Sequence, residues 1–327
     1  MQPMPNGTEK GKTLTRHYKG YWLTKFVDFF PLLGFLAIVL VFGIATKGKM
    51  FRPFNLKTIW KQSFLYIVGG LGVIFCYAQG VHDFSLASNI ALSAIIGNMV
   101  GGQNPVLTIA VTLLVGAAVG CLNGFLYATT GLSDFILTLC VNFLISGCLT
   151  TLMGSNAYLD GCKTLVALNG QTFETVIILA STLLVGYVFH FTKYGRYCKA
   201  LSAGEVAAVQ CGVKVRGIKF SAFLIAGVTA GLVALLSSIR AGTVGSNTGS
   251  MFHFNIMICM ILGGMPLTGG KDAKILNVFF GVLGCMALTN GMVMLGLPSR
   301  MQDVVKGVVF ITVAVGMTRL REKANAI

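Results

Sequence analysis

Side chains that could carry out covalent or acid–base chemistry are few in this sequence and stand far apart. Only ten residues are Asp or Glu, and no Ser, His and Asp set or carboxylate pair has the spacing of a catalytic site. The four His residues lack the H-x-x-x-H spacing of a helical metal site, and the nine Cys residues include no C-x-x-C pair. We therefore predict no enzyme, no metal site and no cofactor in this chain, and interpret the cysteines as small buried apolar residues.

Residues 6–13 end like a phosphate-binding loop, in Gly-Lys-Thr. Such a loop needs Gly six positions before its Lys, a preceding strand and a following helix. Asn6 stands at the glycine position, and only five residues precede it. We interpret the segment as a solvated basic tail. If ATP and Mg²⁺ drive this protein, they bind to another polypeptide.

A second group of polar residues suits binding rather than catalysis. Asp83 is the only charged residue between Lys61 and Asp134. An isolated carboxylate among apolar residues indicates either a functional pathway or, together with Ser85, the cap of the next helix. Asn side chains on apolar helices can bind ligand hydroxyls or join helices to one another. The pathway candidates are Asp83, Ser85, Asn98, Asn123, Asn142 and Asn290.

The elements that carry these residues are predicted to be membrane helices. Hydrophobic residues make up 55% of the chain and charged residues only 11%, which is too few charges to cover a soluble protein. Disordered, coiled-coil and small disulfide-rich classes are excluded for the same reason. Because a spanning helix takes about 20 apolar residues, we predict an all-α integral membrane protein with about ten transmembrane helices, or between eight and ten, some broken or re-entrant.

Apolar length, Gly and Pro punctuation and charged flanks place these helices. The predicted ranges are 29–46, 62–79, 85–102, 105–129, 134–154, 173–191, 219–239, 253–267, 275–295 and 303–318. The eighth is short enough to be re-entrant. The predicted organisation is a basic tail at 1–28, a transmembrane domain at 29–318 that includes a cytoplasmic loop at 192–218, and a cytoplasmic tail at 319–327.

Charge placement predicts that both termini are cytoplasmic in a multi-pass protein of the cell membrane. This orientation puts 16 of the 25 Lys and Arg residues inside. The five basic residues from Lys47 to Lys61 are the exception, explained either by an amphipathic segment in the outer interface or by a missed turn in the first helix. The net charge of +15 thus indicates topology and affinity for lipid headgroups rather than nucleic-acid binding. No removable signal peptide is expected.

The longest hydrophilic interruption after the first 28 residues runs from Thr192 to Lys219. Glu205 to Gln210 favours a helix, and Gly212 is well placed to end it. From the residues alone, this segment is either an ordinary positive cytoplasmic loop or a docking element for a cytoplasmic partner.

The same segment resembles the coupling helix of permease subunits in ATP-binding-cassette importers for simple sugars, the ribose, xylose, galactose and autoinducer-2 type. The family pattern G-R-x-x-x-A-x-G-x-N-x-x-A-A-x-x-x-G is matched by Gly195, Arg196, Ala200, Glu205, Ala207, Ala208 and Gly212. Ser202-Ala203-Gly204 departs from the usual Gly-Gly-Asn.

Three further stretches match this family in order. Residues 79–88 resemble G-x-x-D-L-S-V-G-S, and residues 120–126, followed by 135–139, resemble G-x-x-N-G and F-I-A-T-L. Residues 262–271 resemble L-G-G-x-S-L-x-G-G-x-G, with Asp272 in place of the next Gly. Glycine pairs in this last stretch permit broken helices and close packing, namely Gly263, Gly264, Gly269 and Gly270.

The resemblance runs from about residue 60 to the C-terminus and implies the transmembrane permease of an importer for a monosaccharide or similar small solute. It also implies three partners: a cytoplasmic ABC ATPase seated on the coupling segment, an extracytoplasmic solute-binding protein, and a second permease copy, either identical or a close paralogue. An ion-driven secondary carrier and a related ABC permease for nucleosides or other small solutes remain the alternatives.

Overall fold

The computed structural model describes residues 29–154, 156–270 and 273–325, and each of the ten predicted apolar segments contains a helix. The phosphate-loop-like residues 6–13, the basic tail and Asp272 lie outside the described residues. The long helices are Phe29–Ala45, α2 Pro53–Gln79, α3 Leu86–Gly101, α4 Pro105–Thr130, α5 Asp134–Met153, α7 Gln171–Gly186, α10 Val215–Ala241, α11 Phe252–Leu262, α12 Ile275–Met294 and α13 Ser299–Asn325. The short elements are η1 Lys49–Phe51, β1 Leu159–Asp160, α6 Lys163–Val166, the π-helix η2 Tyr187–Phe191, α8 Lys193–Leu201, α9 Glu205–Gln210 and β2 Thr243–Val244.

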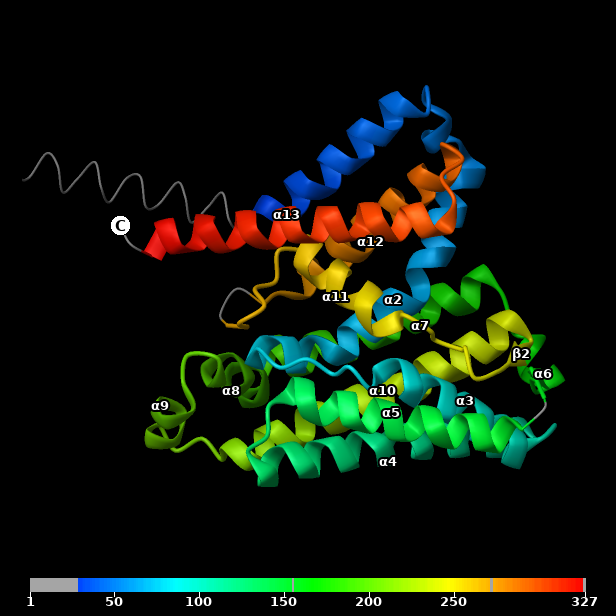
Figure 1. The fold of residues 1–327 in the computed structure, drawn as a ribbon, viewed down its shortest axis with the longest axis horizontal. Helices are drawn as coiled ribbons and strands as arrows, with labels where there is room; N and C mark the ends of the chain where they lie inside the picture. Colours follow the sequence, from blue (N-terminus) through cyan, green and yellow to red (C-terminus); the bar gives the residue numbers. More distant parts are fainter. Residues whose placement is uncertain (1–28, 155, 271–272, 326–327) are drawn as a thin grey trace, which may run out of the picture.

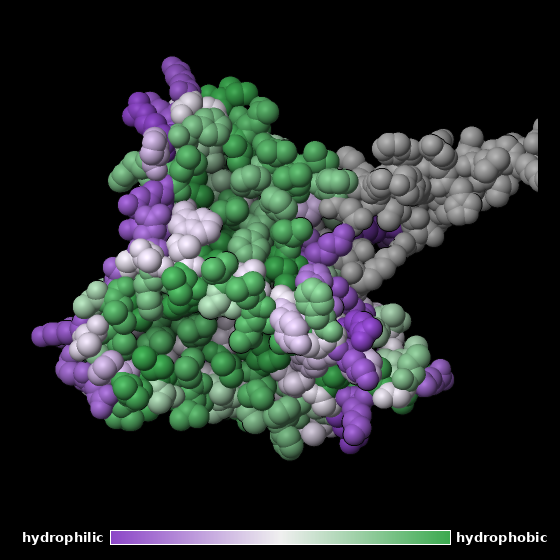
Figure 2. Space-filling view, turned by 180° about the vertical axis from the view of Figure 1, so that it is seen from behind, coloured by the Kyte–Doolittle hydropathy of each residue, from purple (hydrophilic) through white to green (hydrophobic). Residues whose placement is uncertain are grey.

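Six of these helices are long and apolar enough to cross a membrane: α2, α4, α5, α7 continued by η2, α10 and α12. Helices α4, α5 and α10 run the length of the lower half of the molecule, with α8, α9 and the C-terminus at one end and β2 and α6 at the other (Figure 1). Apolar side chains cover the surface between two ends where hydrophilic residues gather (Figure 2). The chain is therefore an all-α membrane protein.

Four predicted helices have bounds that are wrong by four residues or more. Helix α10 begins at Val215 rather than at 219, and α13 runs from Ser299 to Asn325 rather than from 303 to 318. Helix α2 begins at Pro53 rather than at 62, because Pro fits the first turn of a helix. Lys57 and Lys61 therefore lie on α2, and the basic segment is not a separate interfacial piece; only a tight turn and η1 precede the helix. Helix α11 ends at Leu262 rather than 267, and Gly264, with φ of +76°, follows it.

Helix α11 is too short to span a bilayer alone. Its 11 residues rise about 16 Å, against a hydrocarbon core of about 30 Å. The residues before it, Ser246 to Met251, form turns, and Gly249 packs against Ile90 of α3. Helix α11 therefore begins inside the bundle rather than at its edge.

The most extensive helix packing joins α4 to α10, through glycines on both helices. A Cβ on Gly120 would stand 2.5 Å from the carbonyl oxygen of Phe223, and one on Gly227 would stand 2.5 Å from that of Gly116. Gly124 approaches the backbone of Phe220 in the same way. Backbone-to-backbone contact of this kind replaces the hydrophobic driving force that helices lack inside a membrane.

We predict that Gly120→Leu destabilises the fold by about 3 kcal/mol, because the new side chain meets backbone that cannot move aside. Melting of the purified protein in detergent measures this loss. Gly147→Leu on α5 is the matched control, since a Cβ there meets nothing within 4 Å. A Gly120→Leu protein that melts within a degree of the parent would contradict this packing.

Candidate functional site

The chain between α2 and α3 leaves helical geometry inside the bundle. Helix α2 ends at Gln79, Gly80 adopts a left-handed conformation, and α3 begins only at Leu86. Asn123 of α4 donates a hydrogen bond to Ser85 of this segment, at 2.7 Å. Since α4 continues seven residues beyond Asn123, the contact lies about 10 Å inside the end of that helix. Non-helical backbone at such a depth must be buried in protein or line an aqueous path.

Asp83, Ser85 and Asn123 form one buried polar network. Asp83 Oδ1 accepts hydrogen bonds from the Ser85 hydroxyl at 2.6 Å and from the Ser85 backbone amide at 2.9 Å. Ser85 is the N-cap residue of α3, but its own side chain makes no capping bond. Asp83 Oδ2 and Asn123 Oδ1 are buried without a hydrogen-bond partner in the described part of the chain. The network therefore retains two acceptor oxygens for a hydroxyl or water donor.

The first two turns of α5 hold this extended segment in place. Asp134 Oδ2 accepts from the His82 backbone amide at 2.7 Å, and Thr138 Oγ1 accepts from the Phe84 backbone amide at 3.1 Å. The His82 ring also lies beside the Asp134 carboxylate, with Nδ1 and Oδ2 3.6 Å apart. Sequence reasoning did not name these partners, although Thr138 lies in the 135–139 stretch and Asp134 directly precedes it.

Aromatic rings from three elements meet beside the extended segment. The Phe84 ring contacts Phe135 of α5, Phe254 of α11 and His253 of α11, with centroid distances of 5.1, 6.3 and 5.9 Å. The side chains of Phe135 and Phe254 are 51% and 44% exposed. We call Phe84, Phe135, His253 and Phe254 the aromatic cluster.

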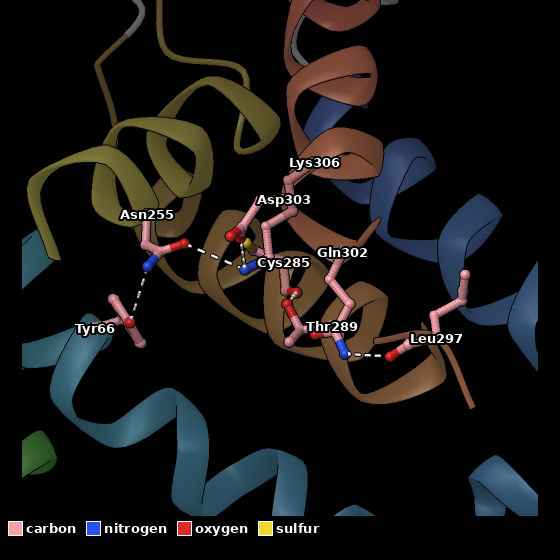
Figure 3. Close-up of polar contacts among 8 residues, drawn as sticks. All are labelled: Tyr66, Asn255, Cys285, Thr289, Leu297, Gln302, Asp303 and Lys306. Atoms are coloured by element: carbon pink, nitrogen blue, oxygen red, sulfur yellow. Dashed lines mark hydrogen bonds and ion pairs between the residues drawn. The ribbon is translucent and has the colours of Figure 1, made fainter. Parts of the chain in front are cut away.

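The first turn of α11 is fixed by a polar chain centred on Asn255 (Figure 3). Asn255 Nδ2 donates to the Tyr66 hydroxyl of α2 at 3.4 Å, and Lys306 of α13 donates to Asn255 Oδ1 at 3.5 Å. Lys306 also pairs with Asp303, at 3.5 Å, and its own side chain is only 12% exposed. These contacts tie α11 to α2 and α13, and so fix the adjacent His253 and Phe254.

The remaining polar candidates do not join the Asp83 network through any hydrogen bond that the structure describes. Asn98 is occupied within the protein: it donates to Ser238 of α10 at 3.1 Å and accepts from the Cys162 amide at 3.2 Å. This is an interhelical tie. Asn142 is partly exposed on α5, and Asn290 is buried on α12 with Oδ1 unpartnered. Only Asp83, Ser85 and Asn123 are brought together.

The segment predicted to dock a partner forms α8 and α9, a compact hairpin at one end of the molecule (Figure 1). Gly195 lies against the end of η2, where a Cβ would be only 2.0 Å from the carbonyl oxygen of Phe189. Helix α9 is packed through a small apolar cluster, which consists of Leu201, Ala208, Val213 and Val215. Gly212 has φ of +76° and follows α9, as its predicted role as a helix stop requires.

The outer side of this hairpin is partly apolar. Val206 is 74% exposed and Val209 is 56% exposed, both on α9. Arg196, Ala200 and Ala207 are exposed as well. Glu205 forms an ion pair with Lys219, with Nζ and Oε2 2.7 Å apart, so its carboxylate already has a partner within the chain. Exposed valines at a hydrophilic end of the protein are typical of an interaction surface.

Cys198 joins the hairpin to α2. Its sulfur accepts a hydrogen bond from Gln79 Nε2 at 3.5 Å, and Phe75 of α2 packs against Phe189 and Tyr194 with centroids 5.5 and 5.3 Å apart. Burial raises the pKa of the Cys198 thiol to about 12. By contrast, Cys211, which follows α9, is exposed.

The loop after α11 contacts both regions. A Cβ on Gly269 would stand 2.4 Å from the Gly80 amide, and the Gly270 amide donates to the Ala78 carbonyl at 3.0 Å. On its other side, Gly270 lies next to Ser202, at the end of α8. Gly263 similarly packs against the carbonyl of Asn277. The four predicted structural glycines therefore permit close backbone contact or, at Gly264, Gly269 and Gly270, a positive φ.

Residues 55–314 match a protein family described as branched-chain amino acid transport system / permease component. This match covers more than half of the chain.

Individual relatives extend over nearly the whole chain. It is 28% identical over 307 residues to the ribose import permease protein of Escherichia coli (strain K12), covering 90% of this chain and 94% of the relative. It is 28% identical over 325 residues to the D-allose transport system permease protein of the same strain, covering 97% and 99%. It is also similar to the L-arabinose ABC transporter permease protein of Azospirillum brasilense, at 28% identity over 250 residues and 74% of each chain.

Proposed function

Because this chain belongs to the permease component family of branched-chain amino acid transport systems, we propose that it forms the membrane pathway of an ATP-binding-cassette importer for a simple sugar. The observation that carries this proposal is the mechanical connection between the α8–α9 hairpin and the broken segment at residues 80–85. ATP hydrolysis belongs to a separate ATPase subunit, and a solute-binding protein delivers the sugar on the other side.

A sugar is favoured over an amino acid by the relatives and by the polar network. The similar proteins are named for ribose, D-allose and L-arabinose. The network offers the unpartnered oxygens of Asp83 and Asn123, and these acceptors suit the hydroxyl donors of a neutral sugar.

The route from the ATPase to the pathway runs through α2. Force on α8 reaches α2 through the Gln79–Cys198 hydrogen bond and the packing of Phe75 against Tyr194. Gly80 follows directly and opens into the segment that carries Asp83 and Ser85. The Gly269–Gly80 contact gives a second route from the hairpin through the loop after α11. Rigid elements that connect two sites in this way can switch together between two arrangements.

Two copies of the chain would enclose the pathway. Phe135 and Phe254 present partly exposed rings beside the broken segment, and these rings are where a second copy would pack. A second identical permease, or a close paralogue, covers these rings and makes a continuous path between the subunits.

The orientation follows from charge. We propose about ten membrane passes with both termini cytoplasmic, together with the α8–α9 hairpin. The last turns of α13 lie at the same end as α8 and α9 (Figure 1). Cytoplasmic termini would put 16 of the 25 Lys and Arg residues inside.

We predict that Val206→Asp combined with Val209→Asp releases the ATPase, because two charges replace the exposed apolar face of α9. Co-purification of the ATPase with tagged permease and sugar uptake by cells should each fall by about tenfold or more, which corresponds to about 1.4 kcal/mol of binding free energy. Val206 and Val209 are better test positions than Glu205, because a change at Glu205 would also break its ion pair with Lys219.

Arg319→Gln is the control for this docking test. Arg319 is exposed on α13 at the same end, and its change likewise makes that end more negative. It should leave ATPase co-purification near the parent level. If the protein with both valines replaced still assembled with the ATPase and imported sugar normally, α9 would not be part of the docking surface.

We predict that Cys211 reacts with a membrane-impermeant maleimide only from the cytoplasmic side. The permease carries Cys121→Ser, Cys140→Ser and Cys148→Ser, which removes the other exposed thiols. At pH 8, inverted vesicles should label Cys211 within minutes, and intact cells should not. Cys198 should stay unlabelled in both, since its pKa of about 12 leaves little thiolate. Labelling of Cys211 in intact cells would reverse the topology.

A further inference from the structure

We propose that the aromatic cluster of Phe84, Phe135, His253 and Phe254 is an internal gate on which the passing sugar stacks, at the point where two interrupted helices meet. This inference rests on the proposed function and assigns sugar contacts to particular residues. The ligand class is a neutral furanose or pyranose, whose C–H face is apolar and whose edge carries hydroxyls.

The position of the cluster is the first argument. Phe84 lies in the extended segment before α3, and His253 and Phe254 lie in the first turn of α11. Both helices begin inside the bundle, and the centroids of Phe84 and His253 are 5.9 Å apart. Interrupted helices that start within the membrane are where transporters place their substrate sites. The cluster therefore stands where α3 and α11 both begin within the bundle.

The chemistry of the cluster is the second argument. The electron-rich ring faces attract the weakly positive C–H groups of a sugar ring, and Phe135 and Phe254 have exposed ring surface to offer. Three buried polar atoms of the cluster and of the adjoining Asp83 network have no partner among the described residues: His253 Nδ1, Asp83 Oδ2 and Asn123 Oδ1. Burying a polar atom without a hydrogen-bond partner is unfavourable in free energy. Hydroxyl groups of a bound sugar would supply the missing hydrogen bonds.

Conformation is the third argument. The unpartnered atoms are inaccessible to solvent in this arrangement, and the Phe84 ring is packed against three other rings. A shift of the extended segment would move Phe84 and open the polar atoms to a ligand. That segment is continuous with Gly80, which Gly269 contacts directly. The cluster is therefore closed here and connected to the elements that the ATPase would move.

Hydrogen bonds from neighbouring helices fix the position of the aromatic cluster on two sides. The side chains of Asp134 and Thr138 accept hydrogen bonds from the backbone amides of His82 and Phe84. Near His253, Asn255 is bound to Tyr66 and Lys306 (Figure 3). A gate needs such fixed edges, because recognition depends on the spacing of its walls.

Cysteine accessibility tests the inference in membrane vesicles that hold the complete importer. Phe254→Cys and Phe135→Cys are introduced after Cys121, Cys140, Cys148 and Cys211 have been replaced by serine. Leu183→Cys is the control, because Leu183 is 67% exposed on α7, away from the cluster. The reagent is a small hydrophilic cationic methanethiosulfonate, and the probe sugars are D-ribose, D-allose and L-arabinose.

The two cluster cysteines should react about tenfold faster than Leu183→Cys, and one of the sugars should slow that reaction by about threefold. Reaction as slow as at Leu183→Cys, in vesicles that still import sugar, would overturn the gate and leave the proposed function standing. Vesicles of the parent importer that take up none of these sugars with ATP would overturn both.

Uptake kinetics give a second test, which does not depend on cysteine labelling and so is unaffected if a cysteine distorts the cluster. Phe254→Trp keeps a ring and should retain sugar uptake, while Phe254→Leu should raise the KM for uptake by about fivefold without changing ATPase co-purification. Phe143→Leu, at a 67% exposed position on α5 outside the cluster, is the matched control. Equal KM values for Phe254→Leu and Phe143→Leu would contradict ring stacking.

Discussion

Backbone groups that leave a helix inside a membrane need partners from the protein, and residues 81–85 are in this position. The amides of Val81, His82, Phe84 and Ser85 find acceptors in Cys76, Asp134, Thr138 and Asp83. Two of these acceptors belong to α5. Without them, the segment would have to continue as helix or lose its place, because unsatisfied backbone groups cost several kcal/mol each in hydrocarbon, by order of magnitude. Asp83, Ser85 and Phe84 are held where they are by this one constraint.

The same stretch of chain is in contact with the α8–α9 hairpin. The broken segment begins at Gly80, and Gly80 is in contact with Gly269, whose neighbour Gly270 lies beside Ser202 of the hairpin. At Gly80 and Gly269 a Cβ would strike backbone on the facing loop, and at Gly270 the positive φ of +118° favours glycine. The hairpin itself rests on α2 through Gln79 and Cys198. A partner that pushed on α8 and α9 would therefore act on a stretch of chain where helical geometry is already broken.

Most helices could be predicted from the sequence, because their signals are local. Apolar length and flanking Gly, Pro and charge place all ten segments, and the short helix at 205–210 with Gly212 behind it follows from propensity and a backbone preference. The start of α2 at Pro53 was missed because basic residues interrupt its first turns, although Pro53 itself suits the first turn of a helix. Helix α11 was predicted too long because an apolar pattern does not stop at Gly263, where the chain turns to meet Asn277.

The polar site was predictable only in part. Asp83, Ser85 and Asn123 were named from their isolation among apolar residues, and they do meet. Asn98 carried the same signal but is used between helices, which no single-residue pattern can distinguish. The partners Asp134 and Thr138 lie 52 and 54 residues from the amides they bind, and the aromatic cluster joins residues from three separate elements. Such contacts depend on the fold and have no local signature.

Uptake of radiolabelled D-ribose, D-allose and L-arabinose into proteoliposomes tests the central claim most directly. The liposomes contain the permease and its ATPase, with the binding protein and sugar outside and ATP inside. The account predicts accumulation of one of these sugars above its external concentration, dependent on ATP, the ATPase and the binding protein together. Accumulation by the permease alone, driven by an ion gradient without ATP, would contradict it.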